Sequence, residues 1–450
     1  MTTFSLAGKG LKLDTKENLA AHIQPLLDSS DVKSIDLSGN TLGVGACEGL
    51  ADAIMKSKDA LEFADLHDIF TQRLVDEIPP ALDHLVKALL QCPNLHTVDL
   101  SDNAFGLKTK DPLVDFLSQH SPLRHLILNN NGMGPIAGTS IAEALTHLAQ
   151  KKDSARKDGK TIPDLESIVC GRNRLENGSM EAWAQAYKAH NNMKSVKMTQ
   201  NGIRPEGITE LISNGLSNCA SLEVFDLQDN TFTIKGAQAL AKAVPNWPAL
   251  KELGVGDDLL GARGSIKVFE ALAKGGNKNV EVLRLEYNDI TPPGVRALLQ
   301  AAKDGLPALR RVELNGNKFE EEDTSVEELS VLLQERKDEK GTDDDPENHW
   351  GLGDLDELEG EDEDEDEEEA EVDEEEAEVD EEEAEVDEEE EEQEEKREKT
   401  LHEADQAEDA QVSQKKDADV DELADMLGKT KVSQSVGVLA ELGERKSCHD

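Results

Sequence analysis

Residues 123–145 read LRHLILNNNGMGPIAGTSIAEAL, and this stretch decides the fold. Its first six residues alternate as a short strand does, and a stretch with helical periodicity completes it. Between the two, an Asn side-chain amide can close a tight turn by bonding backbone groups. The apolar residues and the Asn stand at the L-x-x-L-x-L-x-x-N-x-L spacing of one leucine-rich repeat: Leu123, Leu126, Leu128, Asn131 and Met133.

The same frame recurs along the chain, mostly in steps of about 28 to 30 residues, which leaves room for a full helix in each unit. Aligned on their first apolar residue, the units begin at Val32, Leu61, Leu95, Leu123, Leu165, Met193, Leu222, Leu250, Val280 and Leu309. We call the position of the Asn the ladder position; it holds Asn40, Asn103, Asn131, Asn173, Asn201, Asn230, Asn288 and Asn317. Asp258 replaces the Asn in one unit and Ile69 in another. The pattern predicts an α/β leucine-rich-repeat solenoid with strands on the concave face and helices on the convex face.

Residues 1–340 are predicted to form this repeat domain with a cap at each end. Residues 4–27 are expected to give a short strand and one apolar helix face, Leu19, Ile23 and Leu26, and a helix near residues 326–333 closes the other end. An insertion, THLAQKKDSARKDGKTIPD (146–164), should extend one helix and then form a surface loop. Its basic residues are expected to be solvated: Lys151, Lys152, Arg156 and Lys157.

The charge of the chain is concentrated behind the repeats. Residues 1–340 carry 38 Lys and Arg against 48 Asp and Glu, whereas residues 341–450 carry 9 against 49. So acidic a segment with few aromatics cannot bury enough apolar surface to offset the entropy of ordering it, so 341–417 is predicted to be disordered. Residues 418–450 are a short tail in which 420–427 forms at most a transient amphipathic helix.

Composition narrows the function classes. The five cysteines form no C-x-x-C pair and the eleven histidines are scattered, so neither disulfides nor a metal site is expected. No long apolar run predicts secretion or membrane insertion, and an acidic chain should not bind nucleic acid through its phosphates. A protein partner with a basic surface fits better.

No motif supports an enzyme, because there is no phosphate-binding G-x-x-x-x-G-K-[ST] loop, no G-x-S-x-G and no H-E-x-x-H. The unit that lacks its ladder Asn instead carries a polar loop, Asp68–Arg73, which suits recognition but equally suits an irregular unit near a cap. Charged residues beside ladder positions are candidates to project from the rim of the solenoid: Asp102, Arg172, Arg174, Asp229 and Asp257. A single ladder Asn is usually structural.

Several runs resemble one family, the Ran GTPase-activating proteins, and its fungal members most. They are DIFTQRLVDEIPPALDHLVKALLQCPNLHTVDLSDNAFG (68–106), LILNNNGMGPIAG (126–138), IVCGRNRLENGSMEAW (168–183), MTQNGIRPEGI (198–208) and FDLQDNTFT (225–233). The resemblance covers the whole repeat region and implies a crescent of about eleven repeats of the ribonuclease-inhibitor type. It also implies binding of the nuclear-transport GTPase Ran in its GTP form, with stimulation of GTP hydrolysis.

The resemblance further implies that no arginine finger is used. An Asn of a repeat loop helps orient the GTPase's own catalytic glutamine, and the matching residue here is Asn131. Arg73 matches the family's loop arginine in an interface or supporting role, and Asn130 and Gly132 flank Asn131 in the same loop. A structural role and a catalytic role therefore compete at Asn131. The GTPase would hold GTP and Mg²⁺, so this chain needs no cofactor.

The implied setting is the cytoplasm, with attachment at the nuclear envelope left open, and the chain is expected to be a monomer that acts on Ran, with or without a Ran-binding protein. The acidic tail is expected to speed encounter with a basic partner or to serve only solubility. The alternative function is a non-catalytic repeat protein that binds or inhibits a partner, as ribonuclease inhibitor does.

Overall fold

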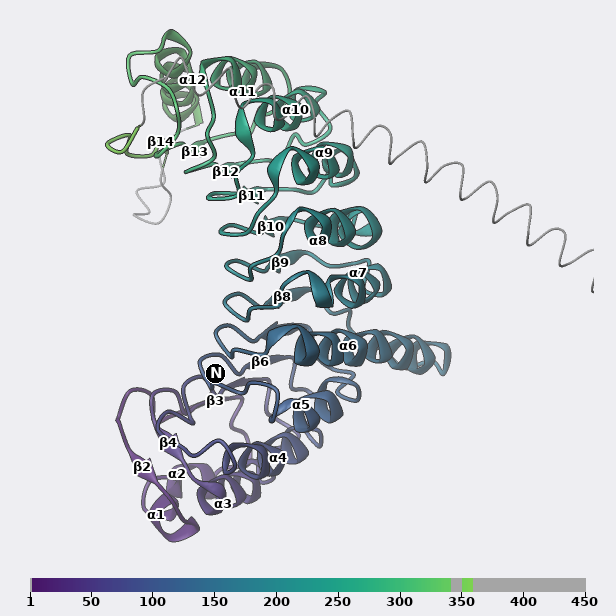
Figure 1. Cartoon of the computed structure of the whole chain (residues 1–450). Coiled ribbons are helices and arrows are strands. Elements are labelled where there is room, and N and C mark those ends of the chain that lie inside the picture. The colour runs from purple at the N-terminus through teal and green to yellow at the C-terminus, as the bar shows by residue number, and fades with distance from the viewer. Residues whose placement is uncertain (1, 341–349, 359–450) are drawn as a thin grey trace, which may run out of the picture. The chain divides into compact units, whose positions relative to one another are not determined.

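The computed structural model describes residues 2–340 and 350–358, which belong to one compact unit. Within it, strand and helix alternate in eleven units, and one further strand follows the last helix. Figure 1 shows the strands along one side of the unit and the helices along the other. The expected α/β leucine-rich-repeat fold and its eleven repeats are confirmed.

The strands form a parallel sheet in which each pairs with the strand of the next unit. In spatial order they are β1 (Thr3–Ser5), β3 (Ser34–Asp36), β5 (Phe63–Asp65), β6 (Thr97–Asp99), β7 (His125–Ile127), β8 (Ser167–Val169), β9 (Ser195–Lys197), β10 (Val224–Asp226), β11 (Glu252–Gly254), β12 (Val282–Arg284), β13 (Arg311–Glu313) and β14 (Gly351–Leu352). A separate two-stranded pair joins β2 (Lys12–Leu13) to β4 (Thr41–Leu42).

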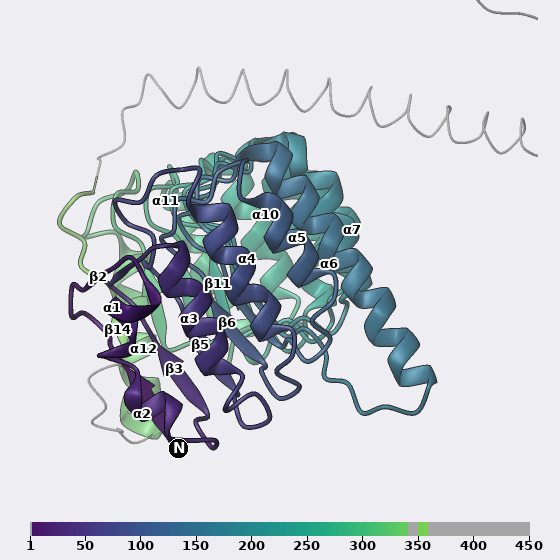
Figure 2. The same ribbon diagram turned by 90° about the horizontal axis from the view of Figure 1, so that it is seen from below.

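The helices lie side by side on the opposite face (Figure 2). They are α1 (Lys16–Ala20), α2 (Gln24–Leu27), α3 (Val44–Ile54), α4 (Ile78–Leu89), α5 (Lys110–Leu117), α6 (Gly134–Lys157), α7 (Met180–Ala189), α8 (Pro205–Glu210), α9 (Thr233–Ala243), α10 (Gly261–Ala273), α11 (Pro292–Asp304) and α12 (Thr324–Lys340). Short 3₁₀ turns lie at Asn177–Ser179, Leu216–Asn218 and Val244–Asn246, and a π-helical turn lies at Leu211–Gly215.

The core runs continuously between sheet and helices. The middle residue of each strand points into it, so that Val98 pairs with Leu126 and Leu126 with Ile168, all fully buried. Adjacent strands are about 4.8 Å apart whereas packed helices need 8–10 Å, so a stack of such units curves toward its strands. The first and third residues of each three-residue strand therefore point to the concave face.

The ladder positions join each unit to its neighbours. The side chain of Asn173, for example, donates from Nδ2 to the carbonyls of Leu128 (2.8 Å) and Gly171 (2.9 Å), and its Oδ1 accepts the N–H of Asn131 (2.9 Å). The ladder asparagines are buried, which confirms their structural reading: Asn40, Asn103, Asn131, Asn173, Asn201, Asn230, Asn288 and Asn317. Each unit is thereby hydrogen-bonded to the next through its turn.

Both caps contain more than the sequence suggested. Leu19, Ile23 and Leu26 are buried as expected, but they do not share one helix: Leu19 lies on α1, Leu26 on α2, and Ile23 is the residue before α2. Pro25, the second residue of α2, has no N–H with which to continue α1. At the other end α12 forms as expected, and β14 then adds a strand beside β13. The packed unit thus extends beyond residue 340.

The insertion extends α6 to 24 residues, so that it projects past its neighbours before the chain turns back (Figure 2). The expectation that Lys152 is solvated is wrong, since only 1% of the residue is exposed. Its ammonium donates to the carbonyls of Ser121 (3.0 Å), Leu123 (2.6 Å) and Pro163 (2.8 Å), and burial lowers its pKa to about 7. Lys152 fastens the insertion to the turn of the preceding unit.

In the described part of the chain, no helix has the length and apolar character needed to cross a bilayer. Four cysteines are buried as free thiols: Cys47, Cys92, Cys170 and Cys219. The predicted disordered segment 341–417, apart from 350–358, and the predicted tail 418–450 lie outside the described residues.

Candidate functional site

The residue directly before each ladder position forms a regular row along one edge of the sheet, which we call the rim row. Each has a positive φ, because the backbone must turn sharply for the next side chain to enter the core. Two members are glycines, Gly39 and Gly316, with φ of 66° and 69°. The other members have φ between 49° and 60°: Asp68, Asp102, Asn130, Arg172, Gln200, Asp229, Asp257 and Tyr287.

The backbone of the rim row is held by the neighbouring unit. The N–H of Asp102 donates to the carbonyl of Asn129, and the N–H of Asn130 donates to that of Gly171, both at 2.9 Å. The side chains are thereby turned outward, and Asp102, Asn130, Arg172, Asp229 and Asp257 are exposed as predicted. Arg174, two residues after Arg172, is also exposed with a positive φ.

Asn131 lies inside the turn rather than on the rim. It is fully buried; its Nδ2 donates to the carbonyls of Leu100, Leu128 and Asn129, each at 3.1 Å, and its Oδ1 accepts the N–H of Asn103 (3.0 Å). Every polar group of this side chain is therefore used by the ladder. Of the two roles that compete at Asn131, the geometry supports the structural one.

Asn130 is the exposed amide of the same loop. Its Nδ2 donates to the carboxylate of Asp102 at 2.7 Å, which fixes the orientation of the amide because a carboxylate can only accept. The carbonyl oxygen Oδ1 is then the end that remains for an outside donor. Gly132 is exposed with a φ of 61°, and nothing lies within 4 Å of where a Cβ would stand, so the surface beside Asn130 is open.

Arg73 is turned inward, with only 7% of its side chain exposed. Its guanidinium donates to Asp14 (2.5 Å), to the carbonyls of Leu13 (3.2 Å) and Thr41 (2.8 Å), and to the hydroxyl of Thr41 (2.9 Å). The hydrogen bond from Arg73 holds the pKa of the Asp14 carboxyl below its usual value. Arg73 therefore ties the irregular loop to the N-terminal cap.

Asp68 also bonds within this loop, where its carboxylate accepts from the hydroxyl of Thr71. The hydrogen bonds of Asp68 and Arg73 thus hold the loop in one conformation and connect it to the first units. The loop is irregular, as one of the two interpretations holds, and its role in recognition stays a prediction.

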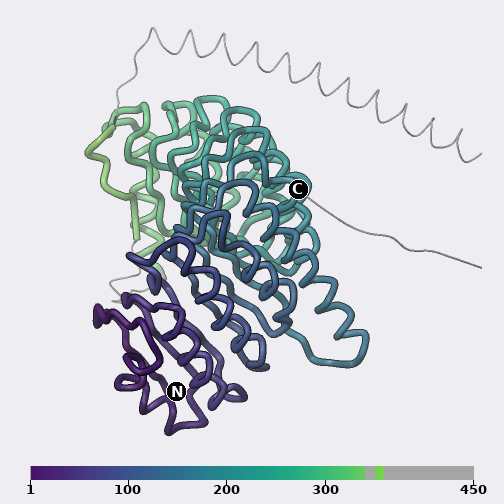
Figure 3. The backbone as a smooth tube through the Cα atoms, turned by 60° about the horizontal axis from the view of Figure 1, so that its bottom comes forward, coloured from purple at the N-terminus to yellow at the C-terminus, as the bar shows by residue number. Residues whose placement is uncertain are grey.

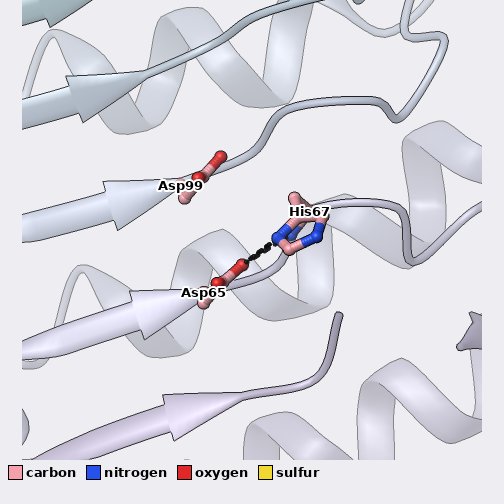
Figure 4. A group of neighbouring side chains, drawn as sticks. All are labelled: Asp65, His67 and Asp99. Atoms are coloured by element: carbon pink, nitrogen blue, oxygen red, sulfur yellow. Dashed lines mark hydrogen bonds and ion pairs between the residues drawn. The ribbon is translucent and has the colours of Figure 1, made fainter. Parts of the chain in front are cut away.

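A third group, which the sequence analysis did not single out, gathers Asp65, His67 and Asp99 (Figure 4). One potential ligand atom of each lies within 4.8 Å of the others, and His67 Nδ1 is 2.6 Å from Asp65 Oδ1. Burial and the nearby Asp65 raise the pKa of Asp99. Burial is the largest single effect on the pKa of His67 and lowers it, but the hydrogen bond to Asp65 and the negative charges of Asp65, Asp99 and Asp102 together outweigh burial, so the net shift is upward. When His67 is protonated, this contact is an ion pair with Asp65.

One signal could have revealed this group beforehand. Asp65 and Asp99 occupy the same position of the repeat frame in consecutive units, and parallel strands bring such positions side by side.

Comparison with known proteins gives consistent relatives. A family model described as Leucine Rich repeat matches residues 91–108, 218–241 and 276–299. The chain is 42% identical over 343 residues to Ran GTPase-activating protein 1 of Saccharomyces cerevisiae, covering 75% of this chain and 82% of that one. It is 32% identical over 354 residues to Ran GTPase-activating protein of Drosophila melanogaster, covering 74% and 58%. Ribonuclease inhibitor of Sus scrofa is 24% identical over 306 residues, covering 66% and 60%.

Proposed function

We propose, from the premise that this chain belongs to the family of Ran GTPase-activating proteins, that it accelerates GTP hydrolysis by Ran in its GTP form through the loop that carries Asn130. The single observation that carries this assignment is the exposed amide of Asn130, held by Asp102 beside the open surface at Gly132. The chain supplies no active site of its own; the GTPase holds GTP and Mg²⁺.

The proposed role of Asn130 is to position the catalytic glutamine of Ran. Phosphoryl transfer depends mainly on alignment of the attacking water and on stabilisation of charge, so a fixed hydrogen-bonding group can contribute much of the acceleration. Asn130 has the required features: its Nδ2 is occupied by Asp102, and its Oδ1 can accept a hydrogen bond from the glutamine amide. Asn131 would have to leave the ladder to do the same.

An arginine finger plays no part in this proposal. The guanidinium of Arg73 already donates to Asp14, Leu13 and Thr41, and releasing it would break these bonds between the loop and the N-terminal cap. Arg73 instead supports the loop on which the partner rests. The exposed charges Arg172, Arg174, Asp229 and Asp257 are proposed to contact the partner along the rim.

The test is single-turnover hydrolysis of GTP on Ran, with saturating wild type, Asn130→Ala, Asn131→Ala or Gln200→Ala. Gln200 is the matched control, because it is another exposed amide of the rim row, two units away. Asn130→Ala should lower the rate constant by about 10²-fold, as misplacement of a reacting group can. Gln200→Ala should leave it unchanged.

Asn131→Ala should lower stability, and its folded fraction, measured by circular dichroism, should account for any lost activity. Wild-type activity in folded Asn130→Ala together with inactive, folded Asn131→Ala would reverse the two roles. A wild type that binds Ran without accelerating hydrolysis would favour the inhibitor-like alternative, to which the ribonuclease inhibitor relationship points.

The remaining parts of the proposal concern setting. The chain acts as a monomer in the cytoplasm, at the nuclear envelope or away from it, with or without a Ran-binding protein.

The acidic tail increases the rate of encounter with basic surfaces of Ran, so deletion from residue 359 onward should lower the association rate and flatten its dependence on salt. Deletion is placed there because residues 350–358 belong to the packed unit.

A further inference from the structure

Four large apolar side chains are exposed in three consecutive units, three of them in loops and one in the first turn of α6, and we call them the apolar row. They are Leu74, Val75, Leu107 and Ile136, exposed by 71%, 53%, 47% and 64%. Single exposed apolar residues are normal on a protein surface, but a contiguous group of them marks an interaction site. Half of the large exposed hydrophobic residues of the described chain lie in this row.

Contacts between the loops place the segments that carry the row side by side. The ammonium of Lys108 is 2.9 Å from the carboxylate of Asp76, so the residues before them in sequence, Leu107 and Val75, are held in adjoining loops. The N–H of Gly106 donates to the carbonyl of Asn131 at 2.9 Å, which joins the second loop to the third. Figure 3 lets the reader follow these successive turns of the backbone.

The fold itself does not require these side chains. In the units with loops at Phe105 and Met133, the residue two positions after the ladder already fills the core, with at most 3% exposed. Later units have the same buried residue, for example Leu175 and Ile203, followed by exposed polar residues such as Glu176. Their loops also expose Leu259 and Tyr287, but the larger group of exposed apolar side chains in the described chain lies next to the loop of Asn130.

We propose that Ran docks on the apolar row through the part of its own surface that lies beside its bound nucleotide. This inference rests on the function proposed above. Ile136, in the first turn of α6, directly follows the loop that carries Asn130, and the loop of Leu107 carries Asp102, whose carboxylate holds that amide. Three neighbouring units span only about 10 to 20 Å, whereas a stable interface buries about 800 Å² on each partner. A GTPase whose glutamine reaches Asn130 therefore covers the row.

The charges around the row define the complementary surface. Asp102 is exposed and Asp68 is half-buried, and both lie on the rim of the same loops. The matching surface of Ran is an apolar patch bordered by basic side chains. Binding through this surface holds the partner, while Asn130 acts on the reaction.

The experiment separates docking from chemistry. Leu74→Ser, Leu107→Ser and Ile136→Ser, singly and combined, are compared with wild type in multiple-turnover hydrolysis of GTP by Ran, with Val331→Ser as the control. Val331 is 57% exposed on α12, on the helical side of the unit. Loss of one buried apolar side chain should raise KM about tenfold, and the combined variant more, with kcat within about twofold of wild type. Val331→Ser should match wild type, and circular dichroism melting should show that every variant is folded.

Each other outcome overturns the proposal. If wild type activates Ran and the folded combined variant keeps its KM, Ran does not dock on the row, although the proposed function stands. If only kcat falls, the row acts on the reaction. If sedimentation shows that wild type is a dimer and the combined variant a monomer, the row joins two copies of this chain. A wild type without any effect on Ran overturns the proposed function as well.

Discussion

Asp258 occupies a ladder position where the other late units have Asn, and replacing it by Asn should stabilise the protein. Asp258 is fully buried; its Oδ1 accepts the N–H of Asn230 at 2.8 Å, but its Oδ2 has no hydrogen-bond partner. In the neighbouring units the corresponding Nδ2 donates to carbonyls, as that of Asn230 does to Leu227 (2.6 Å) and that of Asn288 does to Val255 (2.6 Å). A carboxylate cannot make these bonds.

The magnitude follows from the groups involved. Asp258→Asn keeps the acceptor for Asn230 and gains one or two hydrogen bonds, each with a net contribution of about 0.5–1.5 kcal/mol. It also removes an unpaired buried oxygen, which costs about 1–3 kcal/mol. We expect the free energy of unfolding to rise by about 2–4 kcal/mol near neutral pH.

The gain should depend on pH, and its sign is set by the shifted pKa. Burial raises the pKa of Asp258 well above 3.8, so the folded state binds more protons than the unfolded state from about pH 4 upward. Wild-type stability therefore falls as pH rises through this window, by up to about 1.4 kcal/mol per pH unit. Asp258→Asn does not lose stability in this way, so the difference in free energy of unfolding between the variant and wild type should grow between pH 4.5 and 7.5.

Urea unfolding followed by circular dichroism at pH 4.5, 6.0 and 7.5 measures the difference. Asp257→Asn, at the exposed neighbouring position, is the matched control and should have little effect. Asn230→Asp, the reverse change in the preceding unit, should destabilise. A less stable Asp258→Asn at pH 7.5, or a gain that is the same at all three values, would refute the reasoning.

Three further predictions concern stability. Arg73→Ala should lower the free energy of unfolding by about 2–4 kcal/mol through its lost bonds to the cap, and Arg73→Lys should recover only part in the same urea assay, because one ammonium cannot replace the guanidinium fork. Lys152→Met should cost about 3 kcal/mol and speed proteolysis of the loop at 158–163, because three carbonyls lose their donor; unchanged cleavage would contradict this. Burial lowers the pKa of His120 and His190 to about 4, so stability should fall as pH drops from 6.5 to 4, by up to about 1.4 kcal/mol per unit for each, and an H120N/H190N variant should flatten that slope.

The sequence predicted what is periodic. Repeat spacing located the strands, the ladder and the helices, because each unit meets the same environment. The resemblance assigned the glutamine-orienting role to Asn131, and the sequence did not show that Asn130 is the amide that points outward, since this depends on the positive φ at Asn130. It also missed the burial of Lys152, whose carbonyl partners include Ser121, about one unit earlier in sequence. β14 lay outside the repeat frame and carried no periodic signal.

The backbone of the rim row, held by hydrogen bonds to the next unit rather than by its own side chains, has an evolutionary consequence. A mutation in the rim row to a residue that tolerates positive φ leaves these backbone bonds in place while it changes the proposed contact surface, whereas a mutation one residue later, such as at Asn131, removes bonds that join two units. Residues that can change and residues that the fold constrains therefore stand next to each other in the sequence. A scaffold of this kind can acquire a new specificity one position at a time without first gaining stability to spare.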